Sequence, residues 1–311
     1  MVAQSRGAVP CPAPNDTPTW SLLPSTDRRF EARDGHASAV FRGKLWDIGG
    51  KSGTYTTRRL VPTTRRSDIW NPRMATFFTE KILGVSILVL LEGYSPTPAN
   101  DIWYSPDGGE MPPTAHLAWI QVRYPVPWAQ RGWHCAIALN DLFYVMGGSP
   151  LNNDVWDTDS IVNGNWQATG SVPWSARTGH TCVVHTVKNA KLGDASTKTM
   201  GVLAGGWGDD TKILNDVWLL GDDRTCINYR SPDTLATEAA PWPVRAFSAL
   251  VSLDTHTPSD YLFGPRMWLL GGGRTGHGNF PMFTYTDMCQ SRDGGGFAAF
   301  RSETTSQQPN K

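Results

Sequence analysis

The chain has 311 residues, of which 40% are hydrophobic and 18% are charged. This balance excludes an intrinsically disordered protein, because enough apolar side chains are present to bury a sizeable core. Lys plus Arg and Asp plus Glu number 28 each, so no net positive field attracts nucleic acid or an anionic membrane surface. The longest apolar stretch, 82–91, is shorter than the ~20 residues that cross a bilayer. We therefore expect no nucleic-acid partner and no membrane insertion.

The N-terminus and the cysteines bear on the compartment. Residues 1–14 lack the apolar segment of a secretory signal. The localisation stays unknown, and the missing signal favours the cytoplasm over export. No Cys-x-x-Cys spacing is present, so we expect no thiolate metal site, no metal and no cofactor. The cysteines favour buried free thiols in a reducing compartment over two disulfides with one spare thiol. They are Cys11, Cys135, Cys182, Cys226 and Cys289.

Glycine, proline and tryptophan are abundant, at 31, 23 and 14 residues. Gly and Pro recur along the whole chain, which is typical of many short strands joined by tight turns. The composition therefore predicts an all-β protein with Trp as its chief packing residue.

The first two repeats occupy the N-terminal third of the chain. In the first, Phe30-x-x-Arg33 and His36 precede an apolar strand that ends at Gly49-Gly50, and Asp68-Ile69-Trp70 follows a long basic loop. In the second, the strand over 87–91 ends at a degraded Glu92-Gly93, and Asp101-Ile102-Trp103 and a lone Trp119 follow. Trp70 can close the first repeat or open the second, through Trp70-x-x-Arg73.

Three further repeats follow in the same order. Each has an aromatic-x-x-Arg segment, an apolar strand that ends in a Gly pair, and an Asp-x-[Trp/Cys] segment. The Trp–Arg pairs are Trp128–Arg131, Trp174–Arg177 and Trp242–Arg245, the Gly pairs are 147–148, 205–206 and 271–272, and the Asp segments are 154–156, 216–218 and 287–289. The first two of these repeats also carry His134 and His180 three residues after the Arg. A unit of roughly 45–65 residues with four short strands is one propeller blade.

The double glycine, the downstream aromatic and the Trp resemble the kelch repeat family over residues 20–301. The resemblance implies a kelch-type β-propeller of four-stranded antiparallel blades. Five blades are recognisable in the sequence, and a total of six or seven is possible because the family generally has six or seven. A strand near Trp20 would then close the ring. We expect a flexible segment over 1–19, a single propeller over 20–301 and a disordered tail over 302–311.

Two groups of residues are candidates for a binding face. The repeat arginines precede the first strand of their blades, where kelch propellers place one rim, and could form an anion-binding ring. The alternative that we favour is that each pairs with an Asp or a carbonyl of the adjacent blade. The loops after the Gly pairs share that rim, and Trp207 is their most attractive contact. The candidates are Arg33, Arg131, Arg177, Arg245, Tyr94, Asn152, Trp207, Asp209, Arg274 and His277.

No set of catalytic residues emerges from the sequence. His36, His134 and His180 hold equivalent positions in separate blades, so we favour local backbone partners over metal ligation. A galactose-oxidase-like enzyme would need a Tyr–His set of copper ligands, which the sequence does not offer. A sialidase-like enzyme would need a nucleophilic Tyr with a nearby acid, which the sequence does not offer either. The sequence thus favours a non-enzymatic binding or scaffold module for a protein or peptide partner. Its alternative is a carbohydrate-binding or sugar-modifying propeller.

Overall fold

The computed structural model describes residues 34–41, 44–52, 54–55, 74–82, 85–95, 97–106, 119–170, 172–188, 197–209, 212–221, 226–228, 242–253, 266–274, 283–284 and 288–291. Strands dominate this part of the chain, and all of their pairings are antiparallel. The prediction of an all-β protein is confirmed. No helix in the described residues has the length and apolar character needed to cross a membrane.

The N-terminal strands form two meandering sheets in which each strand pairs with the next. The first contains β1 (Asp34–Phe41), β2 (Lys44–Ser52) and β3 (Thr54–Tyr55). The second contains β4 (Met74–Ile82), β5 (Val85–Ser95), β6 (Thr97–Ser105) and β7 (Ile120–Gln121). Trp20, Trp70 and Arg73 lie outside the described residues, as do the predicted closing strand and the two chain ends.

Three more sheets and a two-stranded ribbon follow. The third sheet contains β8 (Cys135–Leu139), β9 (Leu142–Met146), β10 (Val155–Thr158) and β11 (Gln167–Ala168). The fourth contains β12 (Arg177–Thr178), β13 (Thr181–Lys188), β14 (Thr197–Gly208), β15 (Ile213–Leu220) and β16 (Cys226–Asn228). The fifth contains β17 (Ala249–Leu253), β18 (Arg266–Leu270) and β21 (Met288–Ser291), and the ribbon pairs β19 (Gly273–Arg274) with β20 (Phe283–Thr284).

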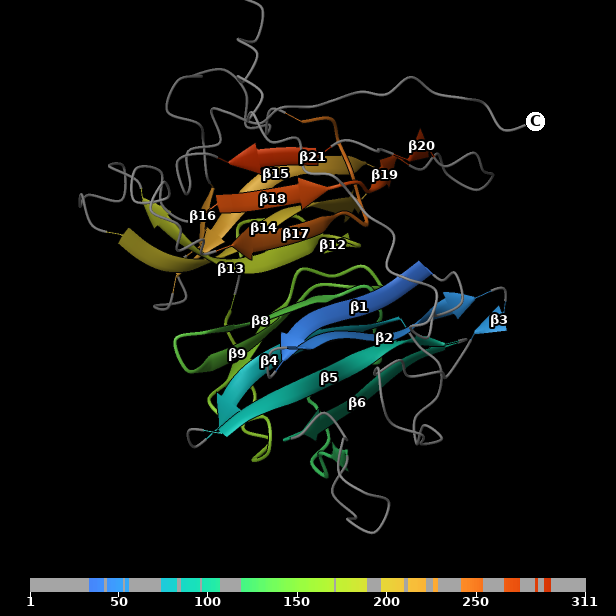
Figure 1. Ribbon diagram of the computed structural model, residues 1–311, viewed down its shortest axis with the longest axis vertical. Coiled ribbons are helices and arrows are strands. Elements are labelled where there is room, and N and C mark those ends of the chain that lie inside the picture. Colours follow the sequence, from blue (N-terminus) through green and yellow to red (C-terminus); the bar gives the residue numbers. More distant parts are fainter. Residues whose placement is uncertain are drawn as a thin grey trace, which may run out of the picture.

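The first long strands of successive sheets lie beside one another, where β13, and not the two-residue β12, is the first long strand of the fourth sheet. β1 contacts β4, β4 contacts β8, β8 contacts β13, and β13 contacts β17. In Figure 1, green β8 and β9 lie beside teal β4, and the orange and red strands β17, β18 and β21 lie beside β13 to β15. Sheets that meet through their first strands in sequence order have the arrangement of propeller blades around an axis.

The core lies in layers between neighbouring sheets, because successive side chains of a strand point to opposite faces. On β9, Phe143 and Val145 pack against Val89 and other residues of the second sheet. The intervening Tyr144 and Met146 pack toward the fourth sheet, against Leu203. A third apolar cluster joins the fourth sheet to the fifth through Val202, Leu219, Trp242 and Leu269, among others. The third and fourth sheets are therefore buried on both faces.

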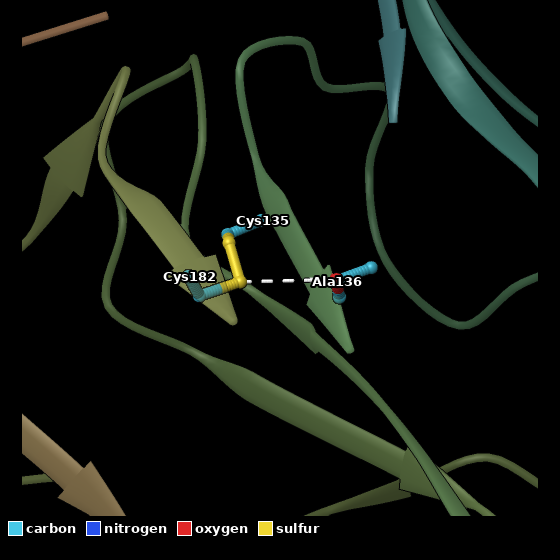
Figure 2. The surroundings of a disulfide bond; sticks show 3 residues. All are labelled: Cys135, Ala136 and Cys182. Atoms are coloured by element: carbon cyan, nitrogen blue, oxygen red, sulfur yellow. Dashed lines mark hydrogen bonds between the residues drawn. A yellow bond between two sulfur atoms is a disulfide. The ribbon is translucent and has the colours of Figure 1, made fainter. Parts of the chain in front are cut away.

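A disulfide crosslinks two first strands. Cys135 of β8 is bonded to Cys182 of β13, across 47 residues of sequence. Figure 2 shows the bond between the two strands, with the Cys182 sulfur 3.8 Å from the carbonyl oxygen of Ala136. The expectation of free thiols is therefore wrong for this pair. Strand periodicity predicted burial of both residues but could not predict their proximity, because the sheet-to-sheet contact is tertiary. The side chains of Cys11, Cys226 and Cys289 are outside the described set.

Candidate functional site

The three sequence marks of the third repeat meet at one ion pair, between buried Arg131 and partly exposed Asp154. Arg131 donates to both carboxylate oxygens of Asp154, at 2.6 Å from Nη1 and 2.7 Å from Nη2. Its Nη1 also donates to the carbonyl of Gly147, at 2.9 Å. Trp156 Nε1 donates to the same Asp154 at 2.8 Å. The Arg, the Gly pair and the Asp-x-Trp segment thus form one hydrogen-bonded unit within a sheet.

The fourth repeat contains the same unit. Arg177 donates to Asp216 at 2.8 and 2.7 Å and to the Gly205 carbonyl at 3.0 Å. Trp218 Nε1 donates to Asp216 at 2.7 Å. Parts of the unit recur on either side of these repeats, in a 2.8 Å bond from Trp103 to Asp101 and a 2.8 Å bond from Arg245 to the Gly271 carbonyl.

A second recurring set of bonds links each sheet to the next. The second Gly of a pair donates its N–H to the backbone carbonyl of the following repeat's Arg, at 2.9 Å for both Gly148 to Arg177 and Gly206 to Arg245. The Asn before the Asp-x-Trp segment donates to the carbonyl of the following Trp, at 3.2 Å from Asn153 and 3.1 Å from Asn215. These partners, on Trp174 and Trp242, belong to the next aromatic-x-x-Arg segment.

This network corrects the expectation of an anion-binding ring. Arg131, Arg177 and Arg245 are only 3, 0 and 1% exposed, so their guanidinium groups cannot grip a ligand at the surface. The partners of the side chains also belong to their own sheet, not to the adjacent blade as expected. Arg33 lies outside the described residues. These arginines stabilise the repeats, because a buried guanidinium requires hydrogen-bonded, charged partners.

Electrostatics agree with a structural role for these groups. Burial acts to raise the pKa of Asp154, but the hydrogen bonds from Arg131 and Trp156 and the Arg131 charge outweigh it, so that the pKa lies below its ordinary value. Burial, followed by the charge of the neighbouring Arg, lowers the pKa of both His134 and His180 to about 3. Both imidazoles are therefore neutral at physiological pH.

His180 packs against a Gly pair that has no room for a side chain. Gly206 has a φ of +104°, and a Cβ there would lie 2.7 Å from the Cβ of His180. Crowding by the neighbouring chain therefore demands glycine at this position of the pair. The side chains of His36 and His277 are not described. Within the described residues no group of three or more His, Cys, Asp or Glu side chains is placed to hold a metal ion.

The position two residues after each repeat Arg has an unusual backbone. Trp133, Gly179 and Phe247 occupy it in the third, fourth and fifth repeats, with φ of 52, 61 and 57°. A chain of backbone bonds joins them, from Phe247 N–H to the Gly179 carbonyl at 2.7 Å and from Gly179 N–H to the Trp133 carbonyl at 2.9 Å. Left-handed backbone is common for glycine but is a genuine outlier for a bulky aromatic residue.

The two aromatic rings meet above the glycine between them. The ring centroids of Trp133 and Phe247 are 5.9 Å apart, and the ring planes are inclined by 78°. A Cβ on Gly179 would lie 2.6 Å from Cε1 of Phe247, so the Phe247 ring covers this glycine. Phe247 is 40% exposed, and Trp133 is partly exposed. We call Trp133 and Phe247 the aromatic pair.

The aromatic pair lies beside several predicted binding residues. Bridges join Gly132 to Ser149 and Ala246 to Gly273, which places the pair next to the segments that follow the Gly pairs. Trp207 pairs with Thr178, the neighbour of Gly179.

The predicted loop residues differ in exposure. Arg274 and Asp209 are exposed, and Trp207 and Asn152 are partly exposed. Asn152 already bonds the Pro150 carbonyl at 2.9 Å and accepts from Arg131 at 3.4 Å. The side chain of Tyr94 is not described.

The sequence carried a signal for the aromatic pair that our reading missed. The first and fourth repeats have Gly35 and Gly179 two residues after the Arg, whereas the third and fifth have Trp133 and Phe247. An aromatic residue at a repeat position that otherwise takes glycine is the signal that identifies the pair.

Comparisons with known proteins support the fold. No protein-family model and no curated protein matches the sequence. Among solved structures, the chain is similar to one described as the structure of YjhT, with a TM-score of 0.54 and 14% sequence identity. The match covers 87% of this chain and 84% of that one. Together with the antiparallel sheets, this similarity indicates a β-propeller-like fold.

Proposed function

We propose that the chain is a kelch-type propeller of at least five blades that acts as a non-enzymatic binding module. It holds a protein or peptide partner on the rim that carries the aromatic pair, Trp133 and Phe247. The recurrence of the Arg, Gly-pair and Asp-x-Trp unit supports the kelch assignment, since the marks that resemble the family are also the groups that bind one another in the third and fourth repeats.

The left-handed backbone of the aromatic pair is the observation that carries the binding proposal. Backbone strain of this kind costs on the order of 1–3 kcal/mol per residue and persists where surrounding structure enforces it, often in ligand clamps. Glycine would relieve the strain at both positions. The retention of large rings, one of them 40% exposed, therefore supports a role for the rings at the surface.

The geometry of the pair favours a peptide side chain as its ligand. Rings inclined by 78° form a corner, with the face of one ring beside the edge of the other. A compact apolar side chain, such as Leu, Met or Pro, contacts both walls of such a corner. Exposed Arg274 and Asp209 supply charges of both signs nearby, and an apolar centre with a polar rim is the usual anatomy of a protein interface.

Selection of peptides on the intact protein tests this proposal. A random-peptide display library is enriched on the wild type, and the affinity of the enriched peptides is measured for the Phe247→Gly and Trp133→Gly variants. We expect each variant to weaken binding at least about tenfold, the loss typical of a contact worth more than ~1.4 kcal/mol. Both should fold as well as the wild type, since glycine suits φ values of 57 and 52°.

Tyr124→Ala is the matched control, because Tyr124 is an aromatic residue that is 59% exposed and belongs to no left-handed position. It should leave the affinity of the enriched peptides unchanged. Peptides whose affinity is the same for the wild type and both glycine variants would place the binding face elsewhere and contradict the proposal.

A further inference from the structure

A cavity of about 470 Å³ lies at the other end of the third sheet. Its lining includes Asp157, Thr158, Asp159, Asn165, Trp166 and Gln167. β10 begins beside Met146, next to the Gly pair, and ends beside Phe143, so Asp157 and Thr158 are at the end of the strand remote from Gly147. The volume is within the range of small-molecule sites, roughly 300–1,000 Å³.

Asp157, which lines this cavity, is a charged residue at a repeat position that is uncharged in the other repeats. It follows the Trp of the Asp-x-Trp segment, where the second, fourth and fifth repeats have Tyr104, Leu219 and Gln290. Asp157 is only 1% exposed, and burial of a carboxylate is costly unless it is hydrogen-bonded. Since an uncharged side chain serves at the equivalent position of the other repeats, packing does not require a carboxylate here. The departure adds a buried negative charge to the lining of the cavity.

Two buried polar side chains of the cavity, Asp157 and Thr158, are held in place. Thr169 Oγ1 donates to Asp157 Oδ2 at 2.8 Å. Thr158 Oγ1 donates to the Ser160 carbonyl at 3.0 Å and accepts from the Ser160 N–H at 3.1 Å. Asp157 is paired in register with Gln167 of β11. A site whose groups are fixed before binding loses less conformational freedom on binding.

Trp166 adds an apolar wall. Its ring meets that of Trp128 edge to face, with centroids 4.7 Å apart and planes inclined by 84°. Trp166 itself is 9% exposed, so only a limited part of the ring is offered to the cavity. The position of that part is fixed, because the rest of the ring is packed in the core between the second and third sheets.

The charges of the lining select the ligand class. Asp157 and Asp159 are carboxylates, and the described lining contains neither Lys nor Arg. A phosphate, nucleotide or acidic sugar would be repelled. Carboxylates accept hydrogen bonds from hydroxyl groups, and the amides of Asn165 and Gln167 both donate and accept them. A sugar ring combines hydroxyl groups at its edge with apolar C–H groups on its face, which suits this polar lining beside Trp166.

We propose that this cavity binds a neutral carbohydrate residue, held through its hydroxyl groups by the exposed Asp159, Asn165 and Gln167 and by contact with Trp166. The site is separate from the aromatic pair and does not depend on the peptide-binding role. A protein with both would present a sugar-binding site at one end of a sheet and a peptide-binding rim at the other.

Saturation-transfer NMR and calorimetry on the full chain test this inference. The probes are the methyl glycosides of glucose, galactose and mannose, N-acetylglucosamine, and N-acetylneuraminic acid as an anionic comparison. We expect at least one neutral sugar to bind and the anionic sugar not to bind. The double variant Asn165→Ala/Gln167→Ala, which changes two exposed side chains, should weaken binding at least about tenfold, because hydrogen bonds to the sugar are lost.

Gln121→Ala is the matched control, since Gln121 is an exposed glutamine on β7, the last strand of the preceding sheet. It should leave sugar binding unchanged, as should Phe247→Gly. Asp159→Asn, which changes an exposed carboxylate, should also weaken binding, and its thermal unfolding is recorded to verify folding. If Asp159→Asn does not fold, the double variant still decides the question.

Four results would overturn the inference. The first is that no neutral sugar binds, and the second is that N-acetylneuraminic acid binds more tightly than the neutral sugars. The third is that the double variant binds sugar as well as the wild type does. The fourth is that Ca²⁺ or Mg²⁺ binds at the cavity in the absence of any sugar. The last result, obtained by calorimetric titration of the two chlorides, would assign the carboxylates to a cation.

Discussion

Phe247 donates its backbone N–H to the carbonyl of Gly179 at 2.7 Å, and its ring occupies the space that a Cβ on Gly179 would need. The two residues belong to successive repeats and share the left-handed conformation. The exposed ring of one repeat thus depends on the missing side chain of its neighbour.

Gly179→Ala should therefore destabilise the fold. A Cβ at this position would lie 2.6 Å from Cε1 of Phe247, and the φ of +61° is strained for alanine. We expect a loss of about 1–3 kcal/mol in the free energy of unfolding, measured by urea denaturation. Phe247→Gly should recover part of this loss in the double variant, because it removes the clash. Strictly additive effects would show that the ring and the glycine are not coupled.

The Arg177–Asp216 pair should be essential for stability. Arg177 is fully buried, and its partner carboxylate is 21% exposed. Asp216→Asn leaves the guanidinium buried without its counter-charge, so we expect the free energy of unfolding to fall by about 3 kcal/mol. Asp209→Asn, an exposed residue at the end of the same repeat's β14, serves as the control and should change stability by less than about 0.5 kcal/mol. Equal effects of the two variants would contradict the structural role of the pair.

The Cys135–Cys182 bond should stabilise the contact between the third and fourth sheets. It closes a loop of 47 residues, for which the chain-entropy estimate is about 4 kcal/mol. We expect the Cys135→Ala/Cys182→Ala variant and the reduced wild type to unfold at similarly lower urea concentrations than the oxidised wild type. Peptide mapping without reductant should recover the crosslinked pair. Recovery of both cysteines as free thiols from oxidised protein would contradict the bond.

His134 and His180 should make the protein sensitive to mild acid. Their pKa values are about 3 in the folded state, against 6.5 as the ordinary value. Between these values the unfolded chain binds a proton at each histidine that the folded chain does not, so stability falls as the pH falls from 6.5 toward 3. Each histidine contributes a slope of up to about 1.4 kcal/mol per pH unit.

His180→Gln removes one of these contributions. The difference in unfolding free energy between the wild type and this variant should change with pH between 6 and 4.5, in the direction that reduces the wild type's advantage in acid. Urea denaturation at several pH values measures it. A difference that is independent of pH would show that His180 is protonated equally in both states.

The sequence predicted the unit but not the bonds within it. The Arg, the Gly pair and the Asp-x-Trp segment are all visible as recurring marks, yet Arg131 and Asp154 are 23 residues apart whereas Arg177 and Asp216 are 39 apart. Loops between the strands differ in length, and surface loops tolerate insertions at small energetic cost. A fixed spacing therefore does not identify the partners, and the favoured pairing of each Arg with an Asp or a carbonyl was placed in the adjacent blade and not in its own sheet.

Taken alone, the sequence determined the all-β class, the repeat and the burial of its strands, because these follow from local periodicity and turn residues. Only the tertiary structure decided which residues face one another: the Phe247 ring over Gly179, the guanidinium groups turned inward and the disulfide between first strands. The physical reason is that each of these contacts joins segments distant in sequence, and their proximity depends on how the sheets pack around one another.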